Sequence, residues 1–207
     1  MNASTYRETL KEKILTAAMT AFTKKGIKAV KMDDIAAALS ISKRTLYELY
    51  ENKEDLLLEG IKRYNKNMQD ELHHFASSKV SVMDIISHSF RITIEQLKYT
   101  SPAFYIDLVK YPKIMKHFED DKKSTQKQFL EFLHKGIEEG YFRNDVNYEL
   151  LLYILDAQQH YILMSQLYKK YTMEEIFYNL IFVSIRGFCT NKGIEVLDNF
   201  LLSNNNA

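Results

Sequence analysis

Apolar residues recur along the chain at spacings of three and four, the period of an α-helix, rather than at the alternating spacing of a strand. The first such run predicts a helix over about residues 5 to 25, with an apolar stripe of Tyr6, Leu10, Ile14, Ala17, Ala18, Ala21 and Phe22. Gly26 follows two lysines and suits the left-handed position that ends a helix. Only two prolines and six glycines interrupt the 207 residues. The pattern therefore predicts an all-α protein.

Two short helices are expected next, joined by a tight turn. The segment MDDIAAALS is acidic in its first turn, and the segment SKRTLYELY has Ser42 as a plausible N-cap. Two short helices joined by a turn of about four residues match the helix-turn-helix pattern. A longer helix then starts at Lys53 and continues for about 23 residues, or roughly 35 Å at 1.5 Å per residue.

The rest of the chain predicts further helices. A helix over residues 81 to 99 has Ser81 as its N-cap, whereas Pro102 and Pro112 are expected to cut residues 101 to 120 into short helical pieces. Another helix is expected over residues 125 to 142. The last two expected helices, about residues 147 to 169 and 173 to 190, are apolar over more than one face, so each needs cover on two sides.

Charge is unevenly spread although the formal net charge is only +1. Residues 1 to 53 hold ten Lys and Arg against six Asp and Glu, while residues 54 to 207 hold eighteen against twenty-one. A positive excess in a short N-terminal segment is typical of a nucleic-acid-binding surface, although ordinary solvated lysines would give the same count.

Several other classes of protein are disfavoured. The single cysteine, Cys189, cannot form an intramolecular disulfide, and its apolar neighbours predict a buried thiol in a reducing, cytoplasmic setting. The N-terminus lacks the apolar core of a signal peptide, and no stretch reaches the roughly 18 apolar residues of a membrane span, so no membrane partner is expected. The six histidines form no zinc motif, and phosphate-loop and nucleophile-elbow motifs are missing. No catalytic residue, metal ligand or cofactor is predicted.

Residues 5 to 60 resemble the DNA-binding domain of the TetR (tetracycline-repressor-like) family. The resemblance is carried by Phe22, Gly26, Ile35-Ala36, Ile41-Ser42, Leu46-Tyr47, Tyr50 and Lys53 followed by Leu56-Leu57. Two positions depart from the family pattern: Ser40 stands where glycine is usual, and Lys31 stands where a threonine commonly starts the second helix. The resemblance implies a three-helix DNA-binding domain over residues 1 to 52. A helical regulatory, ligand-binding and dimerisation domain would cover residues 53 to 207.

The SKRTLY segment is expected to enter the major groove of DNA. Lys43 and Arg44 lie in the first turn of its helix, where they can reach guanine O6 and N7, while Thr45 can meet a thymine methyl. By resemblance Tyr47 bonds a phosphate, as does Lys53 at the start of the next helix. The alternative is that the lysines are ordinary surface charges and Tyr47 is a core residue. The full predicted DNA-binding set is Lys43, Arg44, Thr45, Tyr47, Lys53, Ser42 and Lys31.

The resemblance also implies a homodimer and a ligand pocket. The two-sided helices would pair with their copies through Ile154, Tyr161, Ile162, Phe177, Ile181, Ile185 and Phe188, with a thick monomeric core as the alternative. A pocket would be lined by Tyr64, Met68, Phe90, Phe104, Tyr105, Phe129 and Gln158, although core packing explains each of these residues equally well.

The function predicted from these features is that of a dimeric DNA-binding transcriptional regulator. It would be a repressor released from a palindromic double-stranded operator by a small molecule of unknown identity. The alternative is a helical carrier or enzyme that merely contains a helix-turn-helix. That alternative predicts only weak DNA binding that salt abolishes.

Overall fold

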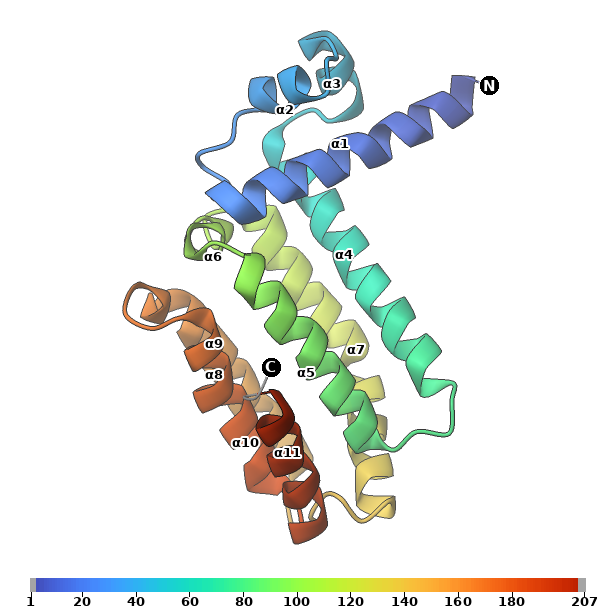
Figure 1. The fold of residues 1–207 in the computed structure, drawn as a ribbon, viewed down its shortest axis with the longest axis vertical. Coiled ribbons are helices and arrows are strands. Elements are labelled where there is room, and N and C mark those ends of the chain that lie inside the picture. The colour runs from blue at the N-terminus through green and yellow to red at the C-terminus, as the bar shows by residue number, and fades with distance from the viewer. Residues whose placement is uncertain (1–2, 205–207) are drawn as a thin grey trace. The chain divides into compact units, whose positions relative to one another are not determined.

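The computed structural model describes residues 3–204, and the regular elements in that range are helices (Figure 1). This confirms the predicted all-α class. The chain forms two compact units: Met1–Gln69 with Tyr99–Phe118, and Asp70–Lys98 with Glu119–Ala207. The functional boundary expected between residues 52 and 53 stays a prediction, since these units reflect packing alone. Within residues 3–204, no helix combines the length and apolar character needed to span a membrane.

The first unit begins with α1 (Ala3–Lys25), which ends as predicted. Gly26 adopts a φ of 86°, in the left-handed region, and its N–H donates to the carbonyl of Phe22 at 2.9 Å. Ile14 and Phe22 are fully buried. The expected stripe is wrong at its start, because Tyr6 is 61% exposed and every residue from 5 to 9 lies on the surface. The buried face of α1 therefore begins at Leu10.

Short helices α2 (Met32–Ala38) and α3 (Lys43–Leu49) follow, as Figure 1 shows beside α1. Ser40, in the turn between them, has a φ of 54°, so serine adopts here the conformation for which the family uses glycine. Ser42 caps α3, since its Oγ accepts the N–H of Thr45 at 3.0 Å. The lysine side chain of Lys31 cannot accept such a bond, and α2 is instead closed by the Lys31 N–H donating to Asp34 at 2.9 Å.

Four longer or linking helices come next: α4 (Lys53–Ala76), α5 (Val82–Tyr99), α6 (Pro102–Leu108) and α7 (Pro112–Glu138). Ser81 caps α5 as expected, with the Asp84 N–H donating to its hydroxyl at 3.2 Å. The expectation of short pieces fits α6 but is wrong after Pro112. This proline occupies the first position of a 27-residue helix, where its missing N–H leaves no hydrogen bond unmade.

The second unit ends with α8 (Tyr148–Met164), the 3₁₀ turn η1 (Leu167–Lys169), α9 (Met173–Ile176), the π-helical segment η2 (Phe177–Phe182), α10 (Val183–Phe188) and α11 (Asn191–Asn204). The single helix expected over residues 173 to 190 therefore contains a change of helical type, and α11 was not anticipated. The ring of Phe90 packs against those of Phe177, Phe182 and Phe200 in this unit's core. Cys189 is buried, as predicted.

Candidate DNA-binding surface

Helix α3 buries one face and exposes the other. Leu46 is fully buried in the core of the first unit, and the helix begins at Ser42, so the polar first turn faces solvent. The side chains of Lys43 and Arg44 are 67% and 88% exposed, and Tyr47 is 48% exposed. The alternative that Tyr47 is a core residue does not fit this exposure. Two cations and a phenol are thus available on one short, well-anchored helix.

Both cations have carboxylate partners that the sequence reasoning missed. The Lys43 ammonium lies 2.6 Å from Asp33 on α2, and Arg44 Nε lies 2.8 Å from Glu48 on α3. A side-chain hydrogen bond, with the attraction of opposite charges, raises the pKa of each cation. The Arg44 pair has the i,i+4 spacing of a helix and was visible in the sequence. The Lys43 pair joins residues ten apart and depends on the turn at Ser40.

The two hydroxyl groups at the start of α3 bond each other. Ser42 Oγ and Thr45 Oγ1 lie 2.8 Å apart, and the Thr45 N–H also donates to Ser42. This arrangement fixes the start of α3 and so the direction of its first turn. Ser42 thus has a capping role, while contact of either residue with DNA stays a prediction.

Lys53 has a structural role that spacing alone did not reveal. Its ammonium donates to the carbonyls of Ile27 and Val30, both at 2.9 Å, and so fastens the loop between α1 and α2 to the start of α4. Partial burial lowers the pKa of Lys53, an effect that the charges of Asp107 and Asp34 oppose. Two of the three ammonium N–H groups are used in these bonds. A phosphate contact by Lys53 stays a prediction. Lys31 is exposed at the end of the same loop.

The residues expected to line a ligand pocket fall in both units. Tyr64, Met68, Phe104 and Tyr105 lie in the first unit, whereas Phe90, Phe129 and Gln158 lie in the second. The rings of Phe104 and Tyr105 meet edge to face at 5.6 Å, and burial raises the pKa of Tyr105. Gln158 accepts a hydrogen bond from Ser184 at 3.0 Å. Phe90, Phe104 and Tyr105 pack in the cores of their units, as the core alternative allowed, whereas Tyr64 and Phe129 are 38% and 40% exposed.

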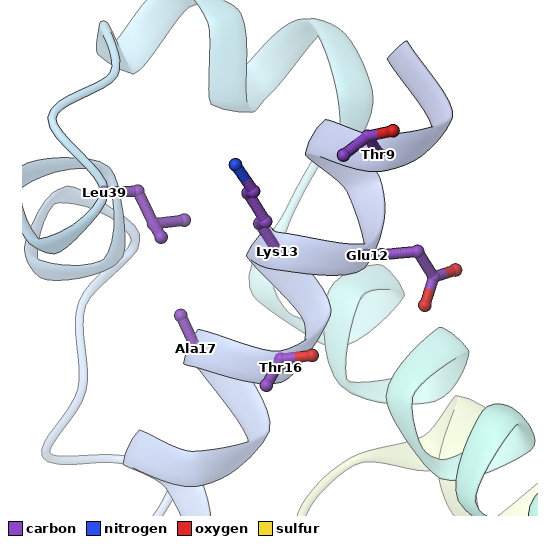
Figure 2. Close-up of a pocket in the computed structure, with 6 residues that line it drawn as sticks. All are labelled: Thr9, Glu12, Lys13, Thr16, Ala17 and Leu39. Carbon is purple, nitrogen blue, oxygen red and sulfur yellow. The ribbon is translucent and has the colours of Figure 1, made fainter. Parts of the chain in front are cut away.

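A hollow of about 420 Å³ lies on the first unit, between α1 and the end of α2 (Figure 2). It is open to solvent and lined by Thr9, Glu12, Lys13, Thr16, Ala17 and Leu39, and Figure 2 shows Leu39 across from Lys13 and Ala17 of α1. None of these residues was expected in a ligand site.

An exposed apolar stripe runs along α8. It is formed by Leu150, Tyr153, Ile154, Ala157, Tyr161 and Met164, which recur at helical spacing and are all exposed. Val183 on α10 is also exposed, and the bond between Gln158 and Ser184 joins the two helices. Of the residues expected in a dimer interface, Ile154 and Tyr161 lie on this stripe. Phe177, Ile181 and Ile185 are half-buried, and Ile162 and Phe188 are buried in the chain's own unit.

Comparison with known proteins identifies the N-terminal helices. Residues 14–59 match the model of the family described as bacterial regulatory proteins, tetR family, and this range covers the helix-turn-helix and the start of α4. Residues 14–59 therefore carry a TetR-family helix-turn-helix. This segment is the DNA-binding helix-turn-helix that the resemblance had implied.

Similar TetR-family proteins extend the match beyond this segment. The HTH-type transcriptional repressor KstR2 of Mycobacterium tuberculosis is 25% identical over 144 residues, which are 67% of this chain and 72% of the relative. The negative transcriptional regulator IcaR of Staphylococcus epidermidis is 33% identical over 66 residues, 32% of either chain. The relatives support a DNA-binding regulator.

Solved structures show the same fold along most of the chain. The reduced form of NemR from Escherichia coli has a TM-score of 0.65 at 14% identity, covering 87% of this chain and 96% of that chain. The ketosteroid transcriptional regulator KstR2 of Mycobacterium tuberculosis has a TM-score of 0.54 at 20% identity, covering 87% and 95%.

Proposed function

We propose that this protein is a homodimeric TetR-family repressor that reads a palindromic operator with the first turn of α3. The observation that carries this is the exposure of Lys43 and Arg44 on a helix whose opposite face, at Leu46, is fully buried. Exposed Lys and Arg donors on a major-groove helix suit guanine O6 and N7. The similar protein KstR2 is named a transcriptional repressor and IcaR a negative transcriptional regulator, and both names support repression rather than activation. Such a protein acts in the cytoplasm and needs no catalytic residue.

The apolar stripe on α8 supports the dimer. Six exposed positions in a row along one helix, with Val183 beside them on α10, form a larger apolar surface than isolated exposed side chains would. A second copy of the same stripe would cover it through a two-fold, self-complementary contact. Two reading helices would then face two half-sites about one helical turn apart or more.

The effector of this repressor is proposed to be a small, largely apolar molecule. Among the proteins of similar fold, KstR2 is named a ketosteroid transcriptional regulator, and FadR from Bacillus halodurans is named a fatty acid degradation regulator. Many phenylalanine, tyrosine and methionine side chains in helices α4 to α8 supply apolar surface for such a molecule.

Selection from a random double-stranded DNA library with the purified protein tests the DNA-binding function. We expect a near-palindromic site to be recovered and to remain bound at about 150 mM salt, in the range where non-specific binding falls steeply. The control is the double variant Lys43→Ala with Arg44→Ala, which leaves the buried face of α3 intact. Recovery of no preferred sequence, or binding that salt abolishes equally for all DNA, would favour the carrier or enzyme alternative.

A further inference from the structure

The loop between α1 and α2, residues 26 to 31, is held from both sides. On one side Lys53 donates to the carbonyls of Ile27 and Val30, both at 2.9 Å. On the other side α6 approaches, and Asp107 Oδ2 accepts the backbone N–H of Lys28 at 2.7 Å. Figure 1 shows α6 beside the end of α1. Both carbonyl and amide groups of this loop are therefore bonded to side chains that are distant in sequence.

Asp107 is a charged residue with little contact with solvent. Only 6% of the residue is exposed, and its two oxygens accept from the Lys28 N–H and, at 2.8 Å, from the Lys110 ammonium. Burial raises the pKa of this carboxyl, but the bonds from Lys110 and Lys28 together outweigh it, so the pKa is lowered. An ionised carboxylate held this far from water is stable only where such donors are fixed in place.

Helix α6 and the loop also meet without space for a side chain. A Cβ added at Gly26 would lie 2.8 Å from the Cβ of Ala103 and 3.3 Å from Asp107 Oδ2. The N–H of Ser101 donates to the carbonyl of Thr23, in the last turn of α1, at 2.8 Å. Together with the Asp107 bond, these contacts fix the end of α1 and the first half of the loop, Gly26 to Lys28, relative to α6.

The same loop leads directly to the DNA-binding surface. Lys28 and Lys31 are exposed on it, and Lys31 immediately precedes α2. Asp33, in the first turn of α2, then pairs with Lys43 in the first turn of α3. The position of the loop therefore determines where Lys31 and the start of α2 lie relative to the reading helix.

We propose that Asp107 is a positioning residue for DNA binding. Its hydrogen bond to the Lys28 N–H places the loop so that Lys31 contacts a phosphate beside the bases that α3 reads. The proposal rests on the proposed DNA-binding function and adds to it a residue of α6, more than 50 positions beyond the helix-turn-helix. Asp107 itself faces the loop backbone and touches no DNA.

The test compares two replacements of Asp107 in the full chain. Asparagine keeps an oxygen that can accept the Lys28 N–H, whereas leucine has the same branched shape, suits a buried site and cannot accept the bond. We expect Asp107→Leu to bind the selected operator more weakly and with a salt slope reduced by about 0.9 per subunit, the effect of losing one phosphate contact. Asp107→Asn should keep the wild-type slope. Lys113→Ala, which removes a 2.5 Å ion pair to Asp55 in the same unit, is the matched control and should also keep it.

A double-variant comparison separates positioning from a general loss of stability. Lys31→Ala should reduce the salt slope by the same amount as Asp107→Leu. The two changes together should reduce it no further, because each removes the same phosphate contact, that of Lys31. Folding is checked by circular dichroism at the temperature of the binding assay. A folded Asp107→Leu variant with the wild-type slope, or additive losses in the double variant, would overturn the proposal. If the wild-type protein itself selects no operator, the proposed function fails instead.

Discussion

In the protein without DNA, Lys43 and Arg44 each form an ion pair with a carboxylate. Ion pairs exposed to this extent exchange readily, so a guanine edge can displace Asp33 or Glu48. The displaced carboxylates still matter, because they lie close to where phosphates would approach. If α3 reads DNA as proposed, these carboxylates lower its attraction for DNA in general and leave discrimination to the donors that fit a base pair.

Alanine at Lys43 or at Arg44 is expected to relax base preference at particular positions by about 1–3 kcal/mol. Binding of the selected operator and of single-base variants, measured by fluorescence anisotropy, gives this value position by position. Phenylalanine at Tyr47 is the control, since losing only a hydroxyl near a phosphate should weaken all sequences alike. Unchanged base preference in both alanine variants would remove base reading from the first turn of α3.

The free energy of unfolding should depend on pH through the buried carboxylate of Asp107. Its pKa is lowered in the folded protein, so its bonds add stability at pH values above the ordinary pKa of 3.8. This stability is lost as the pH falls from that value through the lower pKa of the folded state. The free energies of urea unfolding of the wild-type protein and of Asp107→Asn should therefore differ at about pH 6, and the difference should shrink as the pH falls below about 4. A difference that stays constant across this range would contradict a charged Asp107.

Local features of these residues, such as helix caps and helix ends, could be predicted from the sequence. Ser42 as a cap and Gly26 as a helix end follow from chemistry within a few positions, and the structure has both. The partners of Lys53 and Lys43 depended on tertiary structure. Lys53 meets carbonyls 23 and 26 residues earlier, and no periodic pattern encodes such a contact.

Helices were predictable where an apolar stripe was long, and less so at their ends. Pro112 illustrates the limit, because a proline reads the same in a sequence whether it interrupts a helix or starts one. In the structure Pro112 starts a helix, because the residues before it close the previous one: the N–H groups of Lys110 and Tyr111 donate to carbonyls at the end of α6. The π-helical segment at Phe177–Phe182 likewise had no local signal in the sequence, and its first and last rings pack against Phe90.

The junction of α1 with α6 gives a prediction at the scale of elements. Alanine at Gly26 meets a left-handed φ of 86° and a Cβ contact of 2.8 Å with Ala103, whereas alanine at Gly140 meets a similar φ of 77° and no atom within 4 Å. Gly140→Ala should cost about 1–2 kcal/mol of unfolding free energy from backbone strain alone. Gly26→Ala should cost more, because α6 must also move, and urea unfolding measures both. Equal losses of unfolding free energy would mean that α6 can move away from Gly26 without destabilising the protein.

At the scale of the whole molecule, the apolar stripe on α8 is exposed in the single chain. The expected interface set contained residues of two kinds. Ile162 and Phe188 are 9% and 4% exposed and belong to the chain's own core, while Ile154 and Tyr161 are 52% and 61% exposed. Apolar spacing could not separate them, because a helix that is apolar all round gives no sign of which face its own unit covers.

This division determines how the dimer should be tested. Aspartate at Ile154 or Tyr161 places a charge on the exposed stripe, so it should abolish association while leaving the chain folded, because an unpaired charge buried between subunits costs several kcal/mol. Aspartate at Ile162 should instead unfold the second unit, and Tyr6→Asp, at an exposed tyrosine of α1, should change neither property. Sedimentation velocity and circular dichroism at micromolar concentration distinguish these outcomes. Monomeric variants should also lose most of their operator affinity, since each would hold only one half-site. A wild-type protein that sediments as a folded monomer at that concentration would show that α8 has another partner.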